Sequence, residues 1–155
     1  MSEVLNKRLK QTKFESAAQE ATLNLLVAAN YIRSKHEEVC YNHEITGSQY
    51  NVLRILKGIY PDGYPRCEII QRMIDPSPDV TRLIDRLEKQ RFVERFTSNE
   101  ERRLSISRIT QKGIILLEEM KQAIDDADNL ISSKLTKDEC LKLSELCENL
   151  YKDES

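Results

Sequence analysis

The chain has 155 residues, of which 39% are hydrophobic and 32% are charged, and its formal net charge at pH 7 is −2. This length fits a single domain that can bury a substantial core. No apolar run reaches the ~18 residues that a membrane span needs, and the N-terminal segment lacks the apolar core of a secretory signal. We therefore expect a helix-rich, cytoplasmic protein that makes no contact with a membrane.

Residues 14–39 have the pattern of a long helix. Phe14, Leu25, Ile32 and several alanines recur at steps of three and four positions. The small alanines on this face permit another helix to approach closely. A second helix is expected after Thr46, which can form a capping box with Gln49, and IYPDGYP (59–65) ends that helix.

Two shorter helices are expected on either side of the turn DPSP (75–78). The first runs from Arg66 to Met73. Ser77 is a favourable N-cap for the second, Pro78 suits its first position, and the helix runs to about Gln90. We expect its apolar stripe to be buried and its arginines to lie on the other side; the stripe comprises Val80, Leu83, Ile84 and Leu87. Such a pair is typical of a helix-turn-helix, although an ordinary helical pair has the same pattern.

Two strands are expected directly after this pair. FVERF (92–96) has strand character, and LSISRI (104–109) alternates Leu104 and Ile106 with serines, which is the period of a half-buried strand. TSNEERR (97–103) would connect them as the tip of a hairpin, or wing. Two more helices follow, the first capped by Thr110 and the second starting at Leu135 and Thr136.

This arrangement predicts contacts with both grooves of DNA. Residues 77–112 contain nine basic and six acidic residues, and the local field over such a patch governs its attraction for phosphate. Side chains at the N-terminal end of a helix in the major groove reach base edges. The candidates here are Ser77, Asp79, Thr81, Arg82 and Arg86.

The hairpin supplies the second predicted contact. An arginine on a thin hairpin can enter a narrow A·T-rich minor groove, and we expect Arg102 or Arg103 to do so. Glu101 or Asp85 would then hold the other arginine. The alternative interpretation is a solvated turn whose charges neutralise one another. Asp79 repels phosphate, so we expect it to accept from a cytosine, to orient an arginine, or to interact with the helix dipole.

Three segments resemble the MarR family of bacterial transcriptional regulators over about residues 45–120. They are ITGSQYNVLRIL, CEIIQRMIDPSPDVTRLIDRLEKQRFVER and EERRLSISRITQKG. The resemblance implies a mainly α fold with a small β-hairpin wing in a single domain, 1–155. A winged helix-turn-helix at 46–112 would be flanked by helical dimerisation parts at 10–42 and 113–153.

The resemblance also implies a function. A homodimer would bind a near-palindromic operator in double-stranded DNA, act as a repressor, and be released by a small aromatic or phenolic effector. Two positions depart from the family pattern: Glu101 replaces the usual aspartate of the wing, and Arg91 replaces a usual glycine. Either Arg91 is left-handed, at a cost on the order of 1 kcal/mol, or the turn differs.

Other residues suggest alternative inputs. Four tyrosines are candidates to line an effector site, although each is also an ordinary core or rim residue: Tyr31, Tyr41, Tyr50 and Tyr60. Cys67 follows Arg66 near a helix start, which would lower its pKa, but a small buried residue is the favoured interpretation. Cys140 and Cys147 are seven apart, as core residues are.

A metal-responsive regulator is a further alternative, because His36, Cys40 and His43 are spaced i, i+4 and i+7 and such ligands suit zinc. We predict no metal site or cofactor, since the spacing matches no tight motif. A winged helix used for protein interaction is another alternative. An enzyme is not predicted, because the two histidines are poorly placed for a triad and no phosphate loop or nucleophile elbow is present.

Overall fold

The computed structural model describes residues 3–76, 79–97 and 104–154. The first half contains the helices α1 (Glu3–Leu9), α2 (Ala17–Tyr41), α3 (Gly47–Ile59) and α4 (Arg66–Arg72), with the short strand β1 (Tyr64–Pro65) before α4. The second half contains α5 (Val80–Lys89), the strands β2 (Val93–Thr97) and β3 (Ser105–Ile109), and the helices α6 (Gln111–Ser132) and α7 (Lys137–Tyr151), which a short 3-10 turn follows. The predicted mainly helical fold with a small hairpin is thus confirmed.

Side chains cap most of these helices. Thr46 and Gln49 form the predicted capping box at the start of α3, and Thr136 forms another with Glu139 at the start of α7. Thr110 accepts a hydrogen bond from the backbone N–H of Gly113 in the first turn of α6. An added Cβ at Gly113 would lie 2.5 Å from the carbonyl oxygen of Phe92, so this glycine permits close packing of α6 on the sheet.

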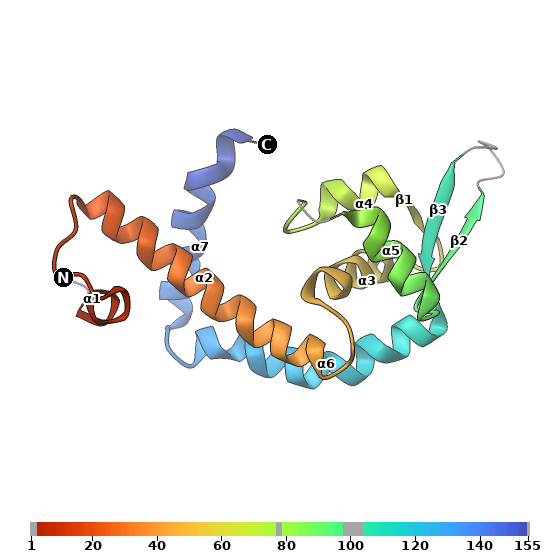
Figure 1. The fold of residues 1–155 in the computed structure, drawn as a ribbon, viewed down its shortest axis with the longest axis horizontal. Coiled ribbons are helices and arrows are strands. Elements are labelled where there is room, and N and C mark those ends of the chain that lie inside the picture. The colour runs from red at the N-terminus through yellow and green to blue at the C-terminus, as the bar shows by residue number, and fades with distance from the viewer. Residues whose placement is uncertain (1–2, 77–78, 98–103, 155) are drawn as a thin grey trace.

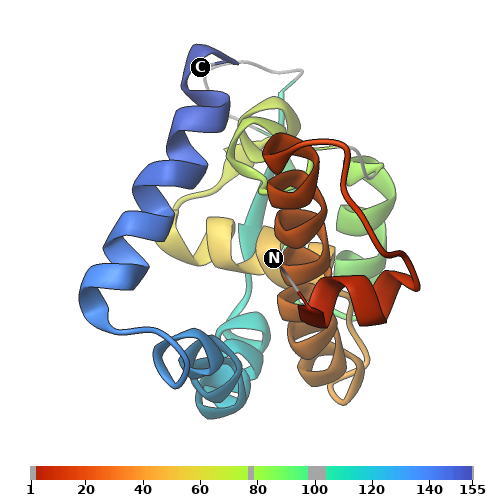
Figure 2. The ribbon, with the colours of Figure 1, turned by 90° about the vertical axis from the view of Figure 1, so that its left-hand side faces the viewer.

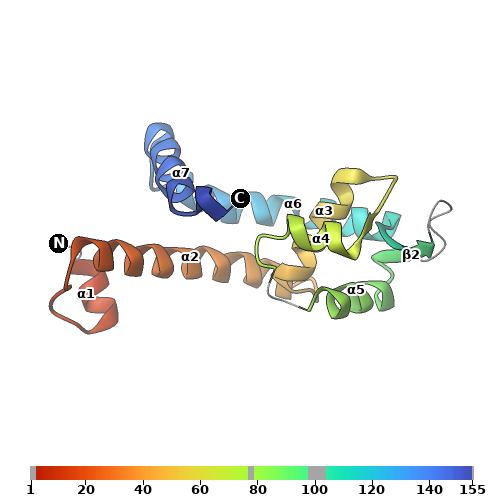
Figure 3. The same cartoon turned by 90° about the horizontal axis from the view of Figure 1, so that it is seen from above.

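The molecule is elongated, and its two long helices form its frame (Figure 1). α2 and α6 pack side by side and run in opposite directions. The elements α3, α4, α5 and the sheet gather at one end of this frame, whereas α1 and α7 lie at the other end. Figure 2 views the molecule from that second end. There α7 follows the end of α6 and lies apart from α2. Figure 3 shows the same separation from above.

The core lies at the winged-helix end. It joins α3, α4 and α5 to the sheet and to the first half of α6, and it extends to the C-terminal end of α2. The predicted stripe of α5 is buried as expected. The alanine-rich face of α2 stays largely exposed in the single chain, and no helix of the described chain has the length and hydropathy to cross a bilayer.

The strands form an antiparallel sheet with the order β1-β3-β2. Tyr64 pairs with Ser107, and Val93 pairs with Ile109. The predicted alternation of β3 holds, but the predicted buried face is wrong. Ser107 is only 3% exposed and Ile109 is buried, whereas Ile106 is half-buried on the opposite face. The cause is that the serine-bearing face of β3 lies against Arg66, Thr81 and Ile84 of the helix pair.

Two elements were not expected from the sequence. α1 has seven residues, which are too few to show a periodic apolar pattern, and its buried residue is Leu5. β1 has two residues, one of them Pro65, and exists through its pairing with β3. The first long helix also begins at Ala17, where Ser16 caps it, and therefore excludes Phe14.

Candidate nucleic-acid interface

α5 presents a cationic face to solvent. Its buried stripe packs on the core, and Arg82, Arg86 and Lys89 are exposed on the other side. The side chain of Arg82 is 80% exposed. Among the described residues, neither Arg86 nor Lys89 forms an ion pair with a carboxylate. The helix therefore carries three cations along the surface that faces away from its own core.

Asp79 ends the turn before α5. It is the N-cap residue, and its Oδ1 accepts a hydrogen bond from the backbone N–H of Arg82 at 3.3 Å. Its Oδ2 lies 3.3 Å from Nε of the same arginine. Two of the roles predicted for Asp79 are observed. Its carboxylate lies at the positive end of the helix dipole, and it orients an arginine.

The predicted N-cap at Ser77 is wrong, because Asp79 occupies that position and the first helical residue is Val80 rather than Pro78. The physical reason is that Asp79 also has a side-chain acceptor for the third residue of the helix, so capping residues compete within this turn. Ser77 and Pro78 lie outside the described residues, so the contact predicted for Ser77 stays a prediction.

Thr81 lies in the first turn of α5 and is held by α4. Its Oγ1 accepts a hydrogen bond from Arg66 at 2.9 Å. The turn between the helices is tied to α3 as well, because the backbone N–H of Ile74 donates to Oδ1 of Asn51 at 3.0 Å. Ile74 itself is 90% exposed. Arg66 and Asn51 thus position the candidate surface, and no periodic pattern in the sequence indicates either role.

Arg95 removes negative charge from the same region. This residue of β2 contacts the carboxylate of Asp85, and its guanidinium lies 3.1 Å from Glu88. Both acidic residues belong to α5, so one arginine from the sheet offsets half of the negative charge on the acidic flank of the helix. The cations on the exposed face therefore act with less opposition from the helix's own carboxylates. Asp85, expected to hold an arginine of the wing, has Arg95 as its partner in the described chain.

The wing has a regular base. β2 and β3 pair from Val93–Ile109 to Thr97–Ser105, and the guanidinium of Arg108 lies 5.0 Å from the ring of Phe96 on the outer face. Arg102 and Arg103 belong to the connection between these strands and lie outside the described residues. Their predicted minor-groove contact, with Glu101 as a partner, therefore stays a prediction.

The turn from α5 into β2 passes through Arg91 with a φ of 64°, so the left-handed alternative is the observed one. Its N–H donates to the Glu88 carbonyl at 2.9 Å, and its carbonyl accepts from the Thr110 hydroxyl at 2.7 Å. These two contacts hold a conformation that an L-residue with a side chain otherwise avoids.

The predicted sensing residues are dispersed. Tyr41 lines a groove of about 770 Å³ beside α5, and Tyr60 lines a separate pocket near β3. Tyr50 packs against the core, and burial raises its pKa. His36 bonds to Asp128 at 2.8 Å, and Nδ1 of His43, which follows α2, lies 3.0 Å from the carbonyl oxygen of Val39. Within the described ranges, no three His, Cys, Asp or Glu side chains are placed to hold a metal ion.

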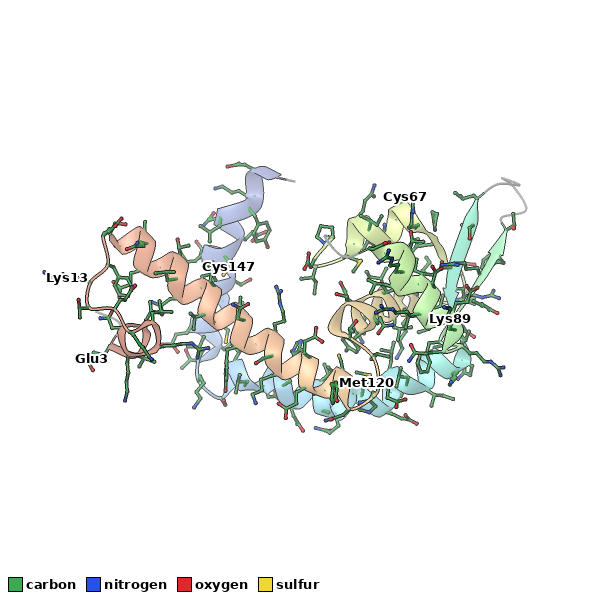
Figure 4. The ribbon with its side chains drawn as sticks, viewed as in Figure 1. Glu3, Lys13, Cys67, Lys89, Met120 and Cys147 are labelled. Carbon is green, nitrogen blue, oxygen red and sulfur yellow. The ribbon has the colours of Figure 1, made fainter. Side chains whose placement is uncertain are left out.

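The cysteines fall into different environments. Cys40 is buried, and burial together with the nearby Glu37 carboxylate raises the pKa of its thiol to about 11. Cys67, favoured as a buried residue, is exposed at the start of α4, because the inward face of that short helix belongs to Ile69. Figure 4 shows Cys67 on the winged-helix end and Cys147 on α7. Cys140 and Cys147 are half-buried.

A helix pair on a three-stranded sheet, with a hairpin after its second helix, defines a winged helix-turn-helix protein. The comparisons identify the family. A crystal structure of a MarR transcription factor from Planctomyces limnophilus is 32% identical in sequence, with a TM-score of 0.68, and the match covers 88% of this chain and 98% of that one. The chain belongs to the MarR family of transcription regulators.

Two more distant structures share the fold. The S. aureus MepR–DNA complex has a TM-score of 0.76 at 19% identity, covering 85% of this chain and 96% of that one. CouR from Rhodococcus jostii RHA1, bound to p-coumaroyl-CoA, has a TM-score of 0.72 at 17% identity, covering 88% and 95%. No family model and no curated protein matches the sequence.

Proposed function

We propose that the protein is a homodimeric repressor that binds a near-palindromic operator in double-stranded DNA and is released from it by a small-molecule effector. The observation that carries this proposal is the exposed cationic face of α5, whose acidic flank is partly offset by Arg95. A helix of this kind fits the major groove of B-form DNA.

The N-terminal part of α5 is proposed to read base edges. Arg82 and Arg86 can each donate two hydrogen bonds to a guanine, a contact worth roughly 1–3 kcal/mol of discrimination. Asp79 supports this role by restraining Arg82 at 3.3 Å. Ser77 and Thr81 are proposed to contact DNA near the helix start, and Arg102 or Arg103 to enter the minor groove. The MepR complex supports DNA as the partner, because it has the same fold.

An exposed apolar surface supports the homodimer. α7 has no fully buried residue in the single chain, and its leucines face solvent; they are Leu141, Leu143, Leu146 and Leu150. Leu25 and Leu26 of α2 are exposed at the same end. Because apolar side chains gain free energy on leaving water, we propose that these helices pack against a second copy. A two-fold dimer would place two recognition helices about one DNA turn, roughly 34–36 Å, apart.

Release by an effector requires that effector binding and DNA binding are thermodynamically linked. A ligand lowers DNA affinity when it binds the DNA-free conformation more tightly than the DNA-bound one. CouR, bound to p-coumaroyl-CoA, supports an effector with an aromatic group for this fold.

The direct test is fluorescence anisotropy with labelled duplex DNA at several salt concentrations. Wild-type protein should show a steep decrease of affinity with salt, because each neutralised phosphate releases counterions. The preference compared is that for a duplex enriched from random DNA by the wild-type protein over random duplex DNA. Arg82→Ala and Arg86→Ala should each reduce this preference by about tenfold. Lys121→Ala, which changes an exposed cation on α6, should leave both properties unchanged. Salt-independent binding or unchanged preference would refute the proposal.

A further inference from the structure

A polar cavity of about 250 Å³ lies between the helix pair and the base of the wing. Its lining comes from three directions: Arg66 starts α4, Thr81 and Ile84 belong to α5, and the two strands supply Arg95, Ser105 and Ser107. All of these side chains except Ile84 are polar or charged. Figure 4 labels Cys67, the residue that follows Arg66 at the start of α4. We call this space the α5–wing cavity.

Arg66 supplies the available positive charge of the α5–wing cavity. It is exposed, and within the described ranges its guanidinium forms no ion pair with a carboxylate. Arg95 differs, because it contacts Asp85 and lies 3.1 Å from Glu88, two carboxylates that do not line the cavity. An anion in the cavity would therefore meet one arginine that has no competing carboxylate. Hydrogen bonds between a guanidinium and an anion are among the stronger ones in proteins.

The hydroxyl of Thr81 is oriented by Arg66. Its Oγ1 accepts a hydrogen bond from Nη1 of Arg66 at 2.9 Å. A hydroxyl has a single proton, and because an oxygen lone pair is used by the arginine, that proton is directed to a different group. The guanidinium has five N–H donors, so it retains others after bonding to Thr81. Arg66 and Thr81 together therefore present both a charged and a neutral donor.

The strand side of the cavity adds further hydroxyls. Ser105 is exposed at the start of β3, whereas Ser107 is only 3% exposed and lies deeper. Both line the same cavity as Arg66 and Thr81. Hydroxyl and arginine side chains are the groups that commonly contact phosphate oxygens in protein–DNA interfaces. The composition of the cavity thus suits a phosphate better than an apolar ligand.

The proposed function indicates which phosphate reaches the cavity. With α5 in the major groove and the hairpin in the adjacent minor groove, the sugar-phosphate strand that separates these grooves runs between the two elements. The α5–wing cavity lies between the same two elements. We propose that it binds one phosphate of this DNA strand, with Arg66 as the charged donor and the hydroxyls of Thr81 and Ser105 as neutral donors. This inference rests on the proposed function.

The phosphate contact has a different role from the contacts of Arg82 and Arg86. A phosphate carries no base identity, so Arg66 and Thr81 set the position of α5 in its groove rather than the sequence that it reads. Arg66→Ala should therefore weaken binding to enriched and to random duplexes by the same factor, about tenfold, and reduce the salt slope by about one. Thr81→Val should also weaken both, whereas Thr81→Ser keeps the hydroxyl and should bind like the wild type.

Anisotropy with methylphosphonate duplexes tests the site on the full-length protein. The duplex is one enriched from random DNA by the wild-type protein, and each phosphate of one strand is replaced in turn by a neutral methylphosphonate. At one linkage the replacement should weaken wild-type binding about tenfold and leave the weaker binding of Arg66→Ala unchanged. Lys121→Ala should keep the full wild-type loss. Arg66→Gln retains an N–H donor for Thr81 without the charge, so it should repeat the result if urea denaturation shows the alanine variant to be unfolded.

The result separates direct contact from structural support. An arginine that only held α5 in place would leave the variant as sensitive as the wild type at every linkage, and that outcome would overturn the phosphate site. Loss of sequence preference in Arg66→Ala would overturn it as well. Wild-type protein that bound no duplex would refute the proposed function together with the site, whereas binding without a silenced linkage would refute the site alone.

Discussion

The carboxylate of Asp79 contacts Arg82 through both of its oxygens, since Oδ1 accepts the backbone N–H and Oδ2 lies beside Nε, each at 3.3 Å. One residue therefore starts α5 and also restrains an arginine that is proposed to read bases. The two roles are separable, because the cap needs an acceptor oxygen whereas the restraint needs a negative charge.

Substitutions at Asp79 test this division. Asp79→Ala should lower the free energy of unfolding by about 1 kcal/mol through loss of the cap, whereas Asp79→Asn should retain most of it, because asparagine is an equally good N-cap. Both variants should discriminate less between selected and scrambled duplexes. Urea denaturation and anisotropy measure these effects, and an asparagine variant as unstable as the alanine variant would contradict the assigned cap.

Arg91 provides a test of backbone conformation. Its φ of 64° is readily adopted by glycine, so Arg91→Gly should be about 1 kcal/mol more stable than Arg91→Ala. The alanine variant is the matched control, because it removes the same charge and keeps the Cβ. Urea denaturation of the pair decides the matter, and an alanine variant as stable as the glycine variant would argue against the left-handed turn.

The proposed dimer can be tested on α7. Leu146 is 52% exposed in the single chain, so Leu146→Glu should leave the protomer folded. If α7 packs against a second copy, the buried charge should shift the protein toward monomers and weaken DNA binding. Ile115→Glu is the matched control, since Ile115 is exposed to a similar degree on α6 at the winged-helix end. Analytical ultracentrifugation should show monomers for the first variant alone; two dimeric variants would exclude this surface.

The cysteines should differ in reactivity. The thiol of Cys40 is buried and its pKa is raised to about 11, so it remains protonated near neutral pH, and the thiolate is the reactive form. Cys67 is exposed. A thiol reagent followed by mass spectrometry should therefore label Cys67 in the folded protein and Cys40 only after unfolding. Equal labelling rates in the folded state would contradict the burial of Cys40.

Local signals in the sequence predicted much of the fold. The capping box of Thr46 and Gln49 depends on residues three apart, and the buried stripe of α5 follows from helical periodicity. Both are properties of a single helix. The buried face of β3 was predicted wrongly because it does not depend on the strand alone. Ser107 is polar, but it is buried because other elements pack on its side of the strand.

The contacts that position the candidate interface could not be predicted from the sequence for a similar reason. Arg95 meets Asp85 and Glu88 because β2 returns alongside α5, and Arg66 meets Thr81 because α4 and α5 cross. Such contacts depend on tertiary geometry, which one sequence does not encode in its spacing. The cations of α5 were predictable, because their exposure follows from the stripe opposite them.

Selection of bound sequences from random duplex DNA tests the central claim most directly. The account predicts an enriched near-palindrome whose two half-sites are centred about one helical turn apart, with guanines at positions that Arg82→Ala and Arg86→Ala no longer select. Failure of the wild-type protein to enrich any sequence, or enrichment of a single unrepeated element by a monomer, would contradict it.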